Sequence, residues 1–144
     1  MQQTQPADIF DLISELQSSL PLAKEKVERA IGTTLKTAGE NEYFVFLEGP
    51  GNRLADGSEV DDIDLRLSKS NPAKALLTFQ VKRRCISPAM VQAHYGNLQV
   101  ADVPRGRSKD EETTFTTTHR QVRLGFGFKE ARPECLSTVV LEPA

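Results

Sequence analysis

The sequence lacks long runs of basic or of apolar residues. Its longest basic run is Lys82-Arg83-Arg84, and the formal net charge of the 144 residues is -2. Nucleic-acid binding needs a basic field along the phosphate backbone, so this charge balance argues against a nucleic-acid partner. No apolar stretch approaches the roughly 20 residues that cross a bilayer, which excludes a membrane-spanning helix.

The N-terminus lacks the basic region and the apolar run of a signal peptide. Residues 1–7 fit a native cytosolic start and a mature exported chain with an added Met equally well. Cysteine is scarce too, since Cys85 and Cys135 are the only two. Two cysteines without C-x-x-C spacing are typical of one disulfide, and two buried thiols are the alternative. We expect the disulfide, and with it a periplasmic or secreted protein whose leader has been removed.

Groups that carry out catalysis are also few. His94 and His119 are the two imidazoles. A small hydrolase built from Cys85 and either histidine is conceivable, because a thiolate beside an imidazole is a competent nucleophile. A bond between Cys85 and Cys135 would abolish that thiolate. The sequence therefore predicts no catalytic residue and no enzymatic activity.

Ligand-binding motifs are missing as well. The acidic segment 56–64 has enough carboxylates for a hard cation, but its spacing does not match a calcium loop. In residues 49–51 a proline stands where a phosphate loop needs a backbone N–H donor. Residues 110–112 are adjacent acids in a loop, which favours a solvated cluster over the paired acids of a glycosidase. We predict no metal and no cofactor.

Periodicity predicts the helices. Apolar residues at i, i+3 and i+4 spacing from Ile9 to Leu20 indicate an amphipathic N-terminal helix within residues 8–20. Pro21 is predicted to open a second helix that runs to Ile31 and ends at Gly32 in a left-handed cap. Ser87-Pro88 and Gly96 mark the start and the end of a third helix.

A period of two predicts six strands, joined by short turn-rich links into antiparallel meanders. These strands cover residues 43–47, 60–67, 75–81, 113–120, 121–128 and 136–141. The second strand is expected to bulge at Asp61-Asp62. In the fifth, Gly125 and Gly127 alternate with apolar residues, which predicts one unusually flat face.

The second half of the chain repeats the plan of the first. Helix positions align at one constant offset, which pairs Val27, Ile31 and Gly32 with Val91, Tyr95 and Gly96. We predict one α+β domain over residues 1–144 whose two tandem units, 22–82 and 86–142, form one sheet packed by helices. Each unit is a helix followed by an antiparallel meander, and the N-terminal helix is an addition. Chance similarity between two common arrangements is the alternative.

Two tandem units of this kind, with the Gly-Phe-Gly-Phe strand at 125–128, resemble the β-lactamase-inhibitor-protein architecture over about residues 22–142. Small outer-membrane-assembly lipoproteins share the single unit. The resemblance implies an exported protein with disulfides that binds a partner through one side of the sheet and its loops. The tandem disulfides of that family are not both present here, and the N-terminal helix is a further departure.

Two loops offer surface for recognition. Loop 102–109 places arginines on a segment shaped by Gly and Pro, and the planar fork of arginine pairs bidentately with carboxylates. The corresponding loop of the first unit is 49–58, and we expect both loops along one edge, where they could enter a partner's cleft together. The predicted partner-binding residues are Asn52, Arg53, Asp56, Arg105, Arg107 and Lys109. Ordinary exposed hairpin loops are the alternative.

The function that these observations favour is that of an inhibitor or immunity protein. Such a protein binds a protein partner, an enzyme or a toxin, without catalysis of its own. A structural or assembly component of the bacterial envelope is the alternative, because fold alone does not decide function.

Overall fold

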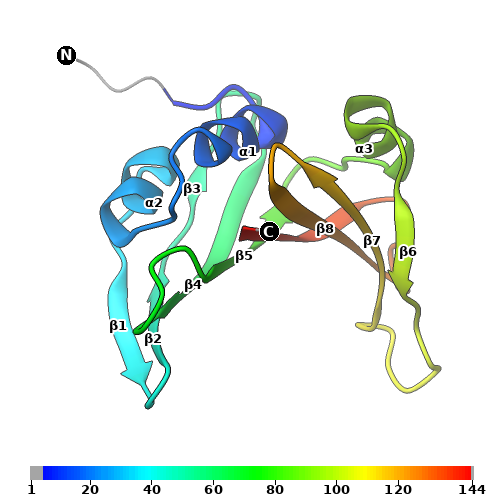
Figure 1. The fold of residues 1–144 in the computed structure, drawn as a ribbon. Helices are drawn as coiled ribbons and strands as arrows, with labels where there is room; N and C mark the ends of the chain where they lie inside the picture. The colour runs from blue at the N-terminus through cyan, green and yellow to red at the C-terminus, as the bar shows by residue number, and fades with distance from the viewer. Residues whose placement is uncertain (1–4, 144) are drawn as a thin grey trace.

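The structure is a computed structural model that describes residues 5–143. Within them three helices accompany nine strands, and all the strands join one antiparallel sheet (Figure 1). The α+β class is therefore confirmed. The helices are α1 (Ile9–Gln17), α2 (Lys24–Ile31) and α3 (Pro88–Tyr95). The strands are β1 (Lys36–Glu40), β2 (Phe44–Gly49), β3 (Asn52–Arg53), β4 (Glu59–Ser68), β5 (Ala75–Lys82), β6 (Gln99–Asp102), β7 (Glu112–His119), β8 (Val122–Lys129) and β9 (Leu136–Pro143).

The order of the strands joins the two halves of the chain at the centre of the sheet. The order is β1-β2-β4-β5-β9-β8-β7-β6, and the short β3 pairs with β4 off this path. At the centre, β5 pairs with β9 so that Leu77 lies opposite Leu141 and Phe79 opposite Val139. The outer strands β1 and β6 form the two edges, and the sheet arches between them (Figure 1).

One face of the sheet carries the hydrophobic core. A row of buried leucines crosses five neighbouring strands in register, and its members are Leu47, Leu65, Leu77, Leu141 and Leu124. Side chains from all three helices belong to the same cluster, among them Leu12, Ile31 and Val91. Because successive side chains of a strand point to opposite faces, the helices cover only this one face.

Helix boundaries follow the capping residues with one exception. Asp8 caps α1 by accepting the backbone N–H of Asp11, and Ser87 caps α3 in the same way. The predicted start of α2 at Pro21 is wrong, since the helix begins at Lys24 after an extended Ala23. The link before it instead buries Leu22, which is 3% exposed, so packing against the core shapes this segment.

Several strand predictions need correction at their ends. The sequence missed β1, β3 and β6, so within residues 5–143 five strands follow α2 and four follow α3, where three were predicted for each unit. The predicted bulge is confirmed, because the β4–β5 register shifts between Asp61 and Asp64. The predicted strand over 113–120 stops at His119. Arg120 and Gln121 have φ values of 51° and 64° and form the two-residue turn of a hairpin.

Candidate functional site

The second face of the sheet is the candidate site, and we call it the open face. Its residues alternate with the buried ones, and all three helices pack on the other side (Figure 1). The open face includes Phe44, Phe46, Glu48, Asp64, Arg66, Ser68, Leu76, Thr78, Gln80, Glu112, Thr114, Thr116, Thr118, Arg123, Gly125, Gly127, Thr138, Val140 and Glu142. Most of these residues are partly exposed, so the face is not a second core. Because it mixes aromatic, polar and charged side chains, it is not a uniformly charged surface either.

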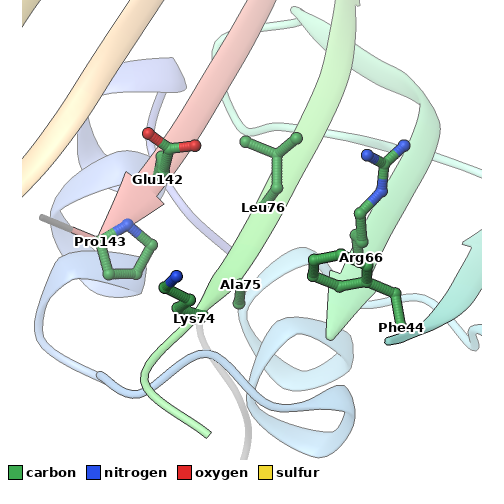
Figure 2. A pocket seen from close by; sticks show the side chains of 7 residues that line it. All are labelled: Phe44, Arg66, Lys74, Ala75, Leu76, Glu142 and Pro143. Atoms are coloured by element: carbon green, nitrogen blue, oxygen red, sulfur yellow. The ribbon is translucent and has the colours of Figure 1, made fainter. Parts of the chain in front are cut away.

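A hollow of about 400 Å³ opens on this face. It lies where the ends of β2, β4, β5 and β9 meet, as Figure 2 shows. We call it the Arg66 hollow, and its lining residues are Phe44, Arg66, Lys74, Ala75, Leu76, Glu142 and Pro143. The cross-strand register places Arg66 between Phe46 on β2 and Leu76 on β5.

The side chain of Arg66 packs beside aromatic rings and has neither a hydrogen-bond partner nor an ion pair among the described residues. Its guanidinium carbon lies 5.1 Å from the ring centre of Phe46 and 5.9 Å from that of Phe44. Its Nε atom is buried and lacks a hydrogen-bond partner, and the side chain forms no ion pair with any residue in 5–143. Leaving a buried polar group unsatisfied costs about 1–3 kcal/mol, so this arrangement calls for a reason.

The other charges of the hollow do not neutralise Arg66. Glu142 lies beyond Leu76 in the register and has its own partner, since its Oε1 is 3.6 Å from Nη1 of Arg123. Lys74 is exposed and, within the described part of the chain, also has no ion pair. The Arg66 hollow therefore keeps a surplus of positive charge.

The glycines of β8 lie on the open face, but they are covered. The carboxylate of Glu112 lies over Gly127 and accepts a hydrogen bond of 2.6 Å from Oγ1 of Thr138. Val140 lies beside Gly125, 3.4 Å from where a Cβ atom would be. The face predicted to be flat is thus filled by neighbouring side chains, because cross-strand neighbours lean into the space that glycine leaves.

In the first-half loop, two predicted partner-binding residues make internal contacts. Nδ2 of Asn52 donates to the carbonyl oxygens of Ile31 and Gly32 at 3.0 and 3.3 Å, which satisfies the end of α2. Asp56 accepts from the backbone N–H of Ser58. Asp56 also lies 3.7 Å from Nη1 of Arg84. Arg53 is exposed.

The second-half loop is ordered by one carboxylate. Glu111 accepts backbone N–H groups from Arg105 at 3.1 Å, Arg107 at 2.6 Å and Ser108 at 3.0 Å. These donors hold the pKa of Glu111 below its ordinary value. Arg105 pairs with Asp102, and both arginine side chains are exposed.

Lys109 pairs with Glu130 at 3.5 Å, which ties the second-half loop to the turn after β8. The expectation that both loops share one edge is wrong. Loop 49–58 contacts the N-terminal segment and α2, whereas residues 103–111 extend from the edge strand β6 of the other half (Figure 1). The sequence could not show this, since strand order decides where loops lie.

The residues considered for catalysis have structural contacts. The predicted disulfide between Cys85 and Cys135 is present, so no thiolate is available there while the bond is intact. His94 stacks on Phe10 of α1 with ring centres 4.4 Å apart. Gln17 of α1 lies 3.2 Å from Nδ1 of His119 and donates to its carbonyl oxygen. Both histidines thus contact α1, although they come from the second half of the chain.

The described residues also bear on metal binding and on membrane insertion. Within residues 5–143, no group of three or more His, Cys, Asp or Glu side chains is placed to hold a metal ion. None of the described helices has the length and apolar character that crossing a bilayer requires. Comparison of the chain with protein-family models, with curated proteins and with solved structures gave no match.

Proposed function

We propose that this chain is an exported, non-catalytic protein that binds a protein partner against the open face, as an inhibitor or immunity protein does. The observation that supports it best is the composition of that face. The side of an antiparallel sheet that lies away from the core is normally solvated and polar. Here it carries aromatic rings, Leu76 and an arginine without a polar partner, and aromatic residues and arginine are enriched in protein interfaces.

The shape of the sheet supports the same proposal. The sheet arches beneath its helices, so the open face lines the inner side of the arch (Figure 1). A concave surface of this kind suits a convex, protruding segment of a partner. The disulfide supports export, because such bonds persist in oxidising compartments.

We also propose that the two halves are tandem units. The helix α2 precedes β1, β2, β4 and β5, and α3 precedes β6 to β9. Each half begins at an edge strand and ends at the centre, so the strand order has the same form from either edge. A duplication accounts for this order with one event, and it extends the open face across both halves.

The second-half loop is the better of the two loop candidates for partner contact. Because Glu111 holds its backbone, the exposed side chains of Arg105 and Arg107 are carried on an ordered segment. A loop that is already ordered before binding loses less conformational entropy on association. In the first-half loop, by contrast, only Arg53 lacks the internal role that Asn52 and Asp56 have.

The test is capture of partners from envelope extract by the oxidised protein, followed by mass spectrometry and an inhibition assay. Thr78→Arg adds a bulky charge at the centre of the open face, and Gln92→Arg adds the same charge on the exposed side of α3. We expect one stoichiometric enzyme or toxin with the wild type and Gln92→Arg, and its loss with Thr78→Arg. Equal capture by Thr78→Arg would contradict the open face as the site. Recovery of assembly components would favour the envelope alternative.

A further inference from the structure

We propose that the Arg66 hollow is an anchor pocket for one carboxylate side chain, an Asp or Glu on a protruding loop of the protein partner. The inference rests on the proposed function for the kind of partner, and on the hollow itself for the chemistry. Among the charged groups of the open face, Arg66 is the one that packs beside two aromatic rings with a buried Nε and has no ion pair within residues 5–143.

The enclosure determines which edge of the guanidinium a ligand can reach. The rings of Phe44 and Phe46 lie against the group, and Nε is buried. In Figure 2 the guanidinium lies at the outer end of the extended Arg66 side chain, on the same side of the sheet as Leu76 and Glu142. The two terminal nitrogens are left to bind, and together they match the two oxygens of a carboxylate.

The aromatic neighbours also strengthen such a pair. The two rings and the burial of Nε lower the dielectric beside the guanidinium, and a charge-assisted hydrogen bond is stronger where the local dielectric is low. The rings hold the side chain in place before the ligand arrives, so less side-chain freedom is lost on binding. Arg66 is in these respects a pre-organised group.

The charge of the hollow favours a single negative charge. Lys74 is exposed to solvent and Glu142 is paired with Arg123, so Arg66 is the one charged residue of the lining that, in the described part of the chain, is neither exposed nor paired. A carboxylate matches the single charge of Arg66, whereas a dianionic phosphate would bring a second negative charge into the hollow beside Glu142. The apolar part of the wall, formed by Ala75, Leu76 and Pro143, suits the methylene groups of an Asp or Glu side chain.

The test uses NMR with isotope-labelled, oxidised protein and three small probes. N-acetyl-glutamate methylamide carries the carboxylate in a peptide setting, its glutamine counterpart lacks the charge, and inorganic phosphate represents the other anion source. The signals followed are the backbone N–H of Leu76 and the Nε–H of Arg66. We expect a saturable shift with the glutamate probe and binding of the glutamine probe at least about tenfold weaker.

Two variants make the result specific. Arg66→Lys keeps the charge but removes the planar fork, so the Leu76 shift should require about tenfold more glutamate probe. Arg83→Lys changes an exposed arginine that already pairs with Glu59 at 3.0 Å, and it should respond like the wild type. Equal responses to the glutamate and glutamine probes, no response to either, or an unaltered response in Arg66→Lys would each overturn the anchor. Tighter binding of phosphate would overturn the assignment to a carboxylate.

The anchor and the proposed function can fail separately. If a partner is captured and lost with Thr78→Arg but held equally well by Arg66→Lys, the open face stands and the anchor is refuted. If the glutamate probe binds through Arg66 but no protein is captured, the chemistry of the hollow stands and the protein partner is refuted. Support for the whole proposal requires both the probe response and weaker capture by Arg66→Lys.

Discussion

Removal of the disulfide is the perturbation whose effect on stability follows most directly from the structure. Cys85 and Cys135 are separated by 50 positions in the sequence and join the segment before α3 to the start of β9. In the chain-entropy model a cross-link that closes a loop of this length stabilises the fold by about 4 kcal/mol. The double variant Cys85→Ala with Cys135→Ala should therefore lose about 4 kcal/mol of unfolding free energy.

Native contacts near the bond indicate that the loss of unfolding free energy arises mainly because the unfolded chain gains conformational freedom. The backbone N–H of Leu136 donates to the carbonyl oxygen of Ile86 at 2.8 Å, which keeps the two segments together beside the bond. Cys85 is exposed, so its replacement removes little packing. Cys135 is 7% exposed, and its replacement leaves only a small gap in the core.

Urea unfolding followed by circular dichroism measures the difference. The oxidised wild type is compared with the double variant, and the reduced wild type is the matched control because it keeps both sulfur atoms. The reduced wild type and the variant should agree within about 1 kcal/mol. Two free thiols in protein isolated under oxidising conditions, or a difference between the oxidised and reduced wild type below about 1 kcal/mol, would refute the reasoning.

Three further predictions concern the loops. The pKa of Glu111 is lowered by its backbone donors, so their hydrogen bonds should persist above the ordinary glutamate pKa of 4.5 and loosen as the pH falls through the lowered value. Hydrogen exchange at the Arg107 amide should show this, and Glu111→Gln should exchange faster even at neutral pH; unchanged protection would count against it. Asn52→Ala should cost about 1 kcal/mol in urea unfolding, because two carbonyl groups at the end of α2 lose their donor, whereas the exposed Asn97→Ala should cost almost nothing. Replacing Arg105 and Arg107 together by Ala should weaken partner capture and leave stability nearly unchanged, and undiminished affinity would remove both from the site.

Patterns close together in the chain were sufficient for much of the fold. The spacing of Ile9, Leu12, Ile13 and Leu16 predicted α1, because a helix needs one apolar side to bury. Alternation of apolar and polar residues predicted the interior strands, because a strand in this sheet buries only one of its two faces. The pairing of Cys85 with Cys135 needed only their count.

Elements that bury little were missed. Every residue of β6 is exposed, and β1 is nearly as exposed, so neither has an apolar period to detect. Edge strands are held by backbone hydrogen bonds to one neighbour, and such bonds leave no trace in the order of side chains. The start of α2 was misplaced because the core buries Leu22, which is a tertiary contact.

The candidate site depended on the tertiary structure almost entirely. The sequence shows Phe44, Phe46 and Arg66 as members of two separate strands, and only the β2–β4 register brings them together. Strand order likewise separated the two loops that sequence correspondence had placed on one edge. Local periodicity decides which face of each element is apolar, because that depends on neighbours along the chain. Which open faces meet, and which charges are left without partners there, depends on pairings between distant residues, and these exist only in the folded sheet.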